Sequence, residues 1–381
     1  MEKKPKIYFH NLDGLRTIAF AFVFLQHGFG NIFKDVKINN FYINKIISFL
    51  FFSGGMGVSI FFVLSGFLIT FLIITEINLN GKLDLKAFYL RRTLRIWPLY
   101  FCVVIFAFEI YPYLKYLIGI HSDLCSRSLF YYFFLSNFDI IHVNETCPGQ
   151  ESMMEAITWS VAIEEQFYLV WPLFFILIPK KKLIYFFYFV IISSLIFRVL
   201  HVNDDNILYL HTLSICGDLA IGGLGAYYII NADKFKNFFI NIKPKTVLIF
   251  YLLGIFFYFF NPEFDFKYFK VVKRIIFDLF FLFIILEQSF SSYTRFKLRN
   301  LRLISSAGKY TYGYYLLHPF AIMLVYNIFR LLDYQVIGLR NILISGTIAL
   351  IITLVISYLS YKYFESYFIR LKHNFSYISS K

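Results

Sequence analysis

A stretch of membrane-spanning length lies near the N-terminus, where residues 11–33 read NLDGLRTIAFAFVFLQHGFGNIF. Apolar residues dominate it, and its length matches the hydrocarbon core of a bilayer. The stretch also contains Asp13, Arg16 and His27, which are costly in hydrocarbon unless they face a polar interior or a partner. It therefore predicts a membrane-spanning helix that turns polar groups toward the inside of a helical bundle.

The spacing of these polar residues places them on one face. Arg16 and His27 are eleven positions apart, which is about 1100° of helical turn, so they lie within about 20° of each other around the axis. The rise between them is about 16 Å, roughly half the hydrocarbon thickness. Asp13, one turn before Arg16, can pair with it. A purely structural helix gains nothing from this arrangement, so we favour a functional role over satisfied packing.

Composition extends this prediction to the whole chain of 381 residues. Hydrophobic residues make up 59% and charged residues 16%, in long apolar runs, which predicts an all-α polytopic membrane protein. We expect a single membrane domain over 1–381, with no appended soluble domain and no cleavable signal. The net charge of +14 lies in short loops between apolar runs, which indicates membrane topology rather than nucleic-acid binding.

The apolar runs and the loop charges predict a topology. We place ten spans at about 11–33, 46–75, 96–118, 159–179, 183–200, 207–230, 246–260, 271–290, 310–331 and 341–363. Lys and Arg alternate between loops so that the positive-inside rule puts both termini in the cytoplasm. The segment 128–141 is short for a span and is expected to be re-entrant or interfacial. It lies in an outward loop with Cys125 and Cys147, whose pairing the sequence leaves open.

Two segments allow more than one interpretation. In SGGMGVSIFFVLSGFLIT, the small residues Ser65 and Gly66 permit either close helix packing or a ligand chain between helices. In FYLRRTLRIWPLYF, the arginines Arg91, Arg92 and Arg95 lie at the cytoplasmic mouth of the third predicted span. They can anchor the span or contact anionic membrane lipids, and they equally suit a polyphosphate ligand.

Acidic residues open the fourth span, in TWSVAIEEQFYLVWP. We expect one of Glu164 and Glu165 to be functional, in the same outward half of the membrane as His27. A carboxylate beside an imidazole can orient the ring and stabilise the imidazolium. The alternative is a structural ion pair, for example with Arg198.

Two more polar residues fall within predicted spans. Asp218 is surrounded by glycines, and His318 precedes Pro319; each can be a functional or a packed polar residue, and His318 taken alone favours packing. The sequence contains no HExxH, paired CxxC, GxSxG or phosphate-loop pattern, so a metal, disulfide-exchange or serine-hydrolase site is not predicted.

Taken in order, these segments resemble the acyltransferase-3 family of integral membrane acyltransferases. The matching segments are NLDGLRTIAFAFVFLQH, SIFFVLSGFLIT, FYLRRTLRIWPLYF, TWSVAIEEQFYLVWP and YLLHPF. The family's Arg-x10-His pair falls on Arg16 and His27, and its WS-x3-E carboxylate falls on Glu164. The chain departs from the family at Cys216, where many members have Arg. It also departs in the segment Glu365, Ser366, Tyr367, Phe368, where members often have Glu-x-Pro-Phe.

The resemblance implies transfer of an acyl group, usually acetyl, from cytoplasmic acyl-CoA to a hydroxyl of an envelope polysaccharide or lipid-linked saccharide. It implies a bacterial cytoplasmic membrane protein with acetyl-CoA as co-substrate and no metal. The expected catalytic residues are His27, Glu164 and Arg16. The expected donor-binding residues are Arg16, Arg91, Arg92, Arg95, Ser65 and Gly66, and the expected substrate-binding residues are Asp13, Trp159, Asp218 and His318. His27 can act as a general base or form an acyl-imidazole, and the sequence leaves both open.

Two other classes of protein compete with an enzyme. A transporter or exporter of a saccharide or small anion would also bury Arg, His and Asp along its path. It leaves the arginine-rich segment and the order of the motifs as coincidence. A non-catalytic scaffold is disfavoured by the cost of the buried charges.

Overall fold

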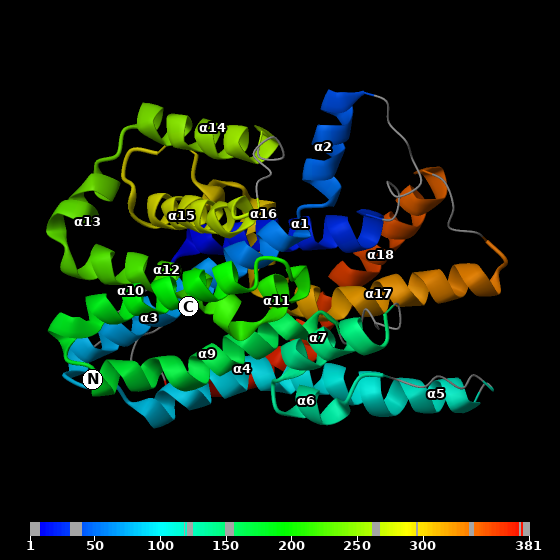
Figure 1. Cartoon of the computed structure of the whole chain (residues 1–381). Coiled ribbons are helices and arrows are strands. Elements are labelled where there is room, and N and C mark those ends of the chain that lie inside the picture. Colours follow the sequence, from blue (N-terminus) through cyan, green and yellow to red (C-terminus); the bar gives the residue numbers. More distant parts are fainter. Residues whose placement is uncertain are drawn as a thin grey trace.

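The structure is a computed structural model that describes residues 8–30, 40–117, 119, 125–148, 156–260, 267–294, 296–334, 339–372 and 375. These residues form helices joined by short connections and contain no strand (Figure 1). The all-α prediction is confirmed. The first half comprises α1 His10–Phe29, α2 Phe41–Phe51, α3 Gly54–Asn80, α4 Leu85–Ile105, η2 Phe106–Ile110, α5 Tyr111–Leu117, α6 Ser128–Tyr132, α7 Ser136–Thr146, α9 Thr158–Leu177, η3 Lys180–Lys182 and α10 Leu183–Leu200. The second half comprises α11 Asp205–Leu210, α12 Thr212–Asn231, α13 Asp233–Ile240, α14 Pro244–Phe260, α15 Phe269–Phe290, η5 Leu298–Asn300, α16 Arg302–Ala307, η6 Gly308–Tyr310, α17 Thr311–Leu331, α18 Leu339–Ser360, η7 Tyr361–Glu365 and α19 Ser366–Lys372.

Six helical segments of the described chain are long and apolar enough to cross a membrane. They are Gly54–Asn80, Leu85–Leu117, Thr158–Leu177, Lys180–Leu200, Asp205–Asn231 and Arg340–Lys372. A seventh span results if α13 and α14, bent by 93°, are counted together. The first predicted span corresponds to α1, which is not among the six, and its last residues, 31–33, lie outside the described part. The chain is thus an integral membrane protein, while ten spans and cytoplasmic termini stay predictions.

The second predicted span, 46–75, is wrong as a single helix. The chain bends at Phe52 and Ser53, and α2 projects from the bundle while α3 runs through it (Figure 1). The break coincides with Gly54 and Gly55, which disfavour a continuous helix. It also frees the Gly54 N–H to donate to Oε1 of Gln26 in α1 (2.8 Å).

The third predicted span begins too late. α4 starts at Leu85, because Asp84 caps it by accepting a hydrogen bond from the Ala87 N–H (2.9 Å). The three arginines of this segment therefore lie six to ten residues after the first residue of α4. The packing of α4 against its neighbours decides which way each arginine side chain points.

The core of the bundle is built on close contact between α3 and α12. A Cβ added at Gly66 would lie 1.9 Å from the Leu219 carbonyl oxygen, and one added at Gly222 would lie 2.0 Å from the Val63 carbonyl oxygen. The two helices are therefore in backbone contact, which only glycine permits at these positions.

The segment 128–141 forms two short helices, α6 and α7, rather than a span. A disulfide joins Cys125 to Cys147 around them, with a Cα–Cα distance of 6.5 Å. The Asn137 side chain donates to the Leu210 carbonyl (3.1 Å), which fixes α7 to the end of α11. This loop is consequently packed against the bundle at a defined position.

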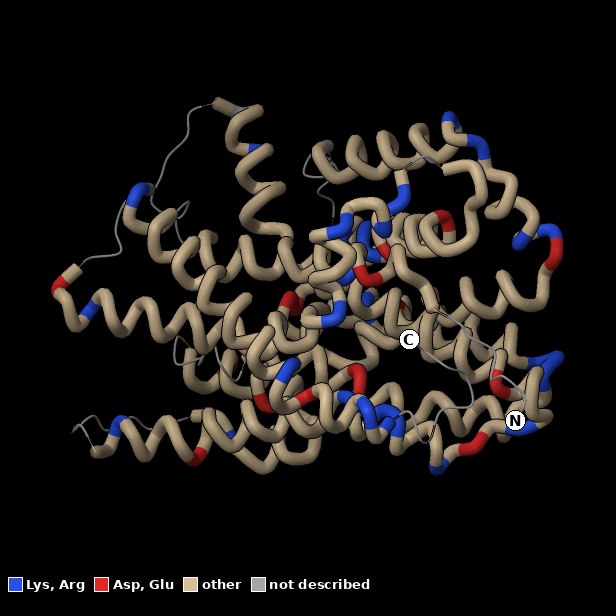
Figure 2. Tube along the Cα trace, turned by 180° about the vertical axis from the view of Figure 1, so that it is seen from behind, with Lys and Arg blue, Asp and Glu red and all other residues tan. Residues whose placement is uncertain are grey.

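Lys and Arg are distributed unevenly between the two ends of the bundle. Figure 2 shows Lys and Arg gathered toward the end of the bundle that holds α13 and the start of α10, with several more in the interior. By the positive-inside rule, an excess of cations is expected at the cytoplasmic end of a membrane protein.

Candidate active site

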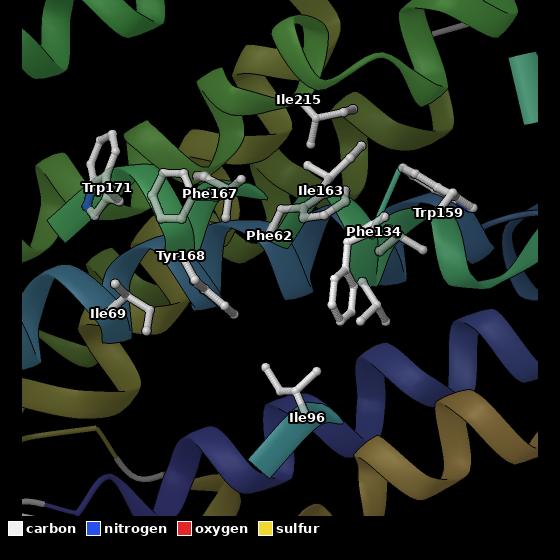
Figure 3. Packing of buried hydrophobic residues seen from close by; sticks show 14 of the residues in the cluster. Phe62, Ile69, Ile96, Phe134, Trp159, Ile163, Phe167, Tyr168, Trp171 and Ile215 are labelled. Carbon is white, nitrogen blue, oxygen red and sulfur yellow. The ribbon is translucent and has the colours of Figure 1, made fainter. Parts of the chain in front are cut away.

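A cavity of about 120 Å³ lies between α1, α3, α4, α9 and α17. Its polar lining consists of Arg16, Ser65, Arg92, Arg95, Ser160, Glu164, Tyr168, Thr311, Tyr312 and Tyr315. Apolar side chains complete the wall, and Figure 3 shows Ile69 of α3 and Tyr168 of α9 directed to the side on which Ile96 of α4 lies. The cavity therefore combines three cations and one carboxyl group with an apolar surround.

The cations of the cavity come from two helices. Arg16 Nη1 pairs with Asp13 Oδ1 (2.6 Å), as the spacing on α1 suggested, and the Tyr8 hydroxyl also hydrogen-bonds Asp13. Burial and this hydrogen bond raise the pKa of Tyr8, so the phenol donates to the carboxylate. Arg92 lies beside the ring of Tyr168 (5.9 Å), and its buried Nε has no hydrogen-bond partner. Unsatisfied guanidinium nitrogens facing a cavity suit an anionic ligand.

Arg91 differs from the other two arginines of α4. Its Nη2 pairs with Glu76 Oε2 (2.7 Å), and its Nη1 donates to the Phe375 carbonyl (2.8 Å). It does not line the cavity. We therefore separate Arg91, which ties α4 to α3, from Arg92 and Arg95.

Of the two adjacent carboxyl groups of α9, only Glu164 lines the cavity. The Tyr168 hydroxyl donates to Glu164 Oε2 (2.8 Å) and also hydrogen-bonds the Ser65 hydroxyl, which places all three groups in one chain. Glu165 instead accepts a hydrogen bond from Trp97 Nε1 (2.7 Å). Tyr168 was not singled out by sequence, although its position one turn after Glu164 could have suggested it.

His27 pairs with a second histidine. Its Nδ1 lies 2.8 Å from Nε2 of His318, which is completely buried in α17. A carbonyl oxygen can only accept, so His318 Nδ1 carries a proton and donates it to the Tyr315 carbonyl (2.7 Å). In the neutral ring His318 Nε2 is then the acceptor, and His27 Nδ1 donates to it. This tautomer leaves a lone pair on His27 Nε2.

The expected contact between Glu164 and His27 is not the one present. His27 has His318 as its hydrogen-bond partner, and Glu164 has Tyr168. Tyr315 accepts from His318 through its carbonyl, lines the cavity and bonds Ser160 through its hydroxyl (2.7 Å), whereas His27 itself does not line the cavity. The sequence placed His318 in the acceptor site, but could not show that α17 crosses α1 at His27.

The remaining predicted site residues lie outside the cavity wall. Gly66 faces α12 in the helix contact described above and does not line the cavity. Trp159 packs between Phe62 and Tyr209, with ring centroids 5.7 and 4.8 Å away. Asp218 is completely buried and paired with Arg198 and Arg274. Within the described residues, no group of three or more His, Cys, Asp or Glu could hold a metal.

Comparison with known proteins identifies the family. Residues 9–362 match the acyltransferase-3 family, described as an acyltransferase domain. The chain belongs to this family. Because this is a family of acyltransferases, the match does not favour the transporter interpretation.

Several relatives of this acyltransferase-3 chain are O-acetyltransferases by name. The chain is 26% identical over 375 residues to O-acetyltransferase OatA of Staphylococcus aureus (strain NCTC 8325), covering 94% of the chain and 57% of the relative. It is 33% identical over 173 residues to peptidoglycan O-acetyltransferase OatA of Listeria monocytogenes, covering 44% of the chain and 24% of the relative. It thus spans between about a quarter and three fifths of these relatives. No solved structure matches.

Proposed function

We propose that this chain is a membrane O-acyltransferase that moves an acetyl group from cytoplasmic acetyl-CoA to a hydroxyl of a cell-wall or other envelope saccharide. Membership of the acyltransferase-3 family and the names of its relatives support the reaction class. The observation that carries the proposal is the hydrogen bond between His27 and His318, which leaves His27 Nε2 as a base inside the bundle.

In this mechanism His27 Nε2 takes the proton of the acceptor hydroxyl while the hydroxyl oxygen attacks the thioester carbonyl carbon. The tetrahedral intermediate collapses with cleavage of the C–S bond. The imidazolium then returns its proton to the departing thiolate, so the products are the saccharide ester and the CoA thiol. His318 keeps the ring of His27 in the reactive tautomer throughout.

The cavity supplies the donor side of the reaction. Arg16, Arg92 and Arg95 offer guanidinium groups to the phosphates of the donor from its cytoplasmic side. Glu164, held by Tyr168, can accept a hydrogen bond from an amide N–H of the pantetheine arm. A cavity of about 120 Å³ does not hold a whole acyl-CoA, so the adenosine lies outside it and the arginines meet the phosphates where the pantetheine arm enters.

The competing mechanism transfers the acetyl group first to His27 Nε2, forming an acyl-imidazole. The two mechanisms differ when the acceptor is absent. Incubation of the purified protein with labelled acetyl-CoA alone should leave no acid-quenched, label-bearing His27 peptide if the histidine is a general base. Recovery of that peptide would replace the general-base mechanism.

The function is tested by transfer of label from acetyl-CoA to the envelope saccharides of cells or membranes that express the protein. We expect transfer with wild type and none with His27→Ala at equal protein level. His142→Gln is the matched control, because His142 is an exposed histidine of α7. Label that persists in His27→Ala would remove His27 from the chemistry, and no label with wild type would contradict the acetyltransferase assignment.

A further inference from the structure

A second cavity, of about 430 Å³, lies between α10, α11 and α15. Arg198, Tyr209, Lys270 and Arg274 are among its lining residues. Three of its eight lining residues are cations, and Asp205 contributes a carboxylate. None of these four residues takes part in the donor cavity.

The cationic side chains of this cavity share one buried ion-pair partner. Arg198 and Arg274 both pair with the single carboxylate of Asp218, with Arg274 Nη2 2.7 Å from Asp218 Oδ2. The cavity lining itself holds three cations and one carboxylate, that of Asp205.

Two cations can turn toward a ligand. Lys270 and Arg274 are one helical turn apart on α15, and their side chains keep 40% and 17% of their exposure. Arg274 Nη1 makes only a long contact with the Leu208 carbonyl (3.4 Å). Lys270 pairs with Asp205, which is 82% exposed, and such surface pairs contribute little. Lys270 can therefore exchange its present contact for a stronger anion, while Arg274 can offer its Nη1 and keep its pair with Asp218.

The cavity lies close to the His27 end of the reaction site. Tyr209 packs on Trp159 and lies against Gly55, where an added Cβ would be 3.5 Å from its ring. The neighbouring Gly54 is hydrogen-bonded to Gln26, the residue before His27. A chain of contacts through Tyr209, the Gly54–Gly55 segment and Gln26 therefore links the cavity to the part of α1 that holds His27.

We propose that this cavity binds the acceptor saccharide through a carboxylate on the sugar, with Lys270 and Arg274 as its anion contacts and Tyr209 against the sugar ring. A carboxylate matches the planar fork of an arginine and the point charge of a lysine. An aromatic face covers the apolar side of a sugar while its hydroxyl groups stay solvated. The proposal rests on the proposed function, since it names the class of acceptor.

Binding can be measured without any acetyl donor. The probe is a tetrasaccharide of N-acetylhexosamine units that carry carboxylate side groups, compared with the same tetrasaccharide after amidation. We expect detergent-solubilised wild type to bind the carboxylate form at least about tenfold more tightly. Lys270→Gln and Arg274→Gln should abolish this preference. Lys267→Gln, which makes the same charge change at an exposed residue outside the cavity, should keep it.

The outcomes separate this proposal from the proposed function. Because no donor is present, a protein without acetyl-transfer activity still gives a result. Equal affinity for the two tetrasaccharides, or equal behaviour of Lys270→Gln and Lys267→Gln, overturns the proposal. Arg274→Gln removes a buried ion pair and can unfold the chain, whereas Lys270→Gln changes an exposed residue and keeps the test valid. Lys270-dependent binding of phosphatidylglycerol vesicles without binding of the carboxylated sugar identifies a lipid site and also overturns it.

Discussion

His27 Nδ1 lies 2.8 Å from His318 Nε2, and the two imidazole rings are parallel to within 5°. The other nitrogen of His318 is committed to the Tyr315 carbonyl. The orientation of the proposed base is therefore set by a second histidine and the backbone of α17. In many acid–base sites a carboxylate has this role.

Replacing His318 should distinguish its effect on the orientation of the His27 ring from any effect on acetyl-CoA binding. His318→Leu removes the acceptor for His27 Nδ1, and kcat should fall by about 100-fold or more while KM for acetyl-CoA stays the same. His318→Gln supplies an amide oxygen as acceptor and should retain more activity than His318→Leu. Steady-state kinetics on purified protein check this order, and equal loss in both variants would indicate a packing role.

The two neighbouring glutamates of α9 should behave differently. Glu164→Gln weakens the hydrogen-bond chain with Tyr168 and Ser65 in the cavity, and kcat/KM should fall by about 100-fold through loss of donor positioning. Glu165→Gln is the matched control, because Glu165 bonds Trp97 and does not line the cavity. Similar loss in both would contradict the assignment of Glu164.

The arginines of α4 should also divide into two groups. Arg92→Gln and Arg95→Gln should each raise KM for acetyl-CoA by about tenfold, because each removes a cation from the donor cavity. Arg91→Gln should instead lower the free energy of unfolding by about 3–5 kcal/mol, because it leaves Glu76 buried without its partner. Donor titrations and thermal unfolding in detergent distinguish the groups. A raised KM with unchanged stability in Arg91→Gln would be contrary to the structure.

The contact between α3 and α12 predicts a stability effect without a direct change in chemistry. Gly66→Ala places a methyl group 1.9 Å from the Leu219 carbonyl oxygen, so the helices must separate, at a cost of about 1–3 kcal/mol or more. Gly55→Ala is the control, because its nearest neighbour outside the local backbone is 3.5 Å away. Thermal unfolding of the two variants should differ clearly, and equal midpoints would show that α3 and α12 adjust freely.

The sequence was sufficient to predict the fold class, because a membrane-spanning helix is visible as a local run of apolar residues of sufficient length. It also placed Arg16 beside Asp13, since residues three apart on a helix are neighbours. It failed at Phe52 and Ser53, where the break depends on two glycines and a hydrogen bond to α1. Apolar length alone cannot reveal such a tertiary contact.

The sequence predicted which residues belong to the site better than it predicted which of them contact one another. The motifs selected His27, Glu164 and the arginines, but the partner of each depends on how distant helices cross. His318 is 291 positions from His27 in sequence, and nothing local indicates their hydrogen bond. In the same way, Arg91 and Arg92 are adjacent in sequence, and only the packing of α4 directs one to Glu76 and the other to the cavity.

The backbone contact between α3 and α12 has a mechanical consequence. Helices that touch through glycine cannot slide or tilt apart without losing many packing contacts, so α3 and α12 form a rigid pair. The opposite wall is formed by α4 and α17, which carry Pro98 and Pro319 within the helix and lack one backbone hydrogen bond at each. α9, which also lines the cavity, carries Pro172 in the same way. A donor larger than the cavity would therefore enter most easily by bending of these proline-bearing helices rather than by separation of α3 from α12.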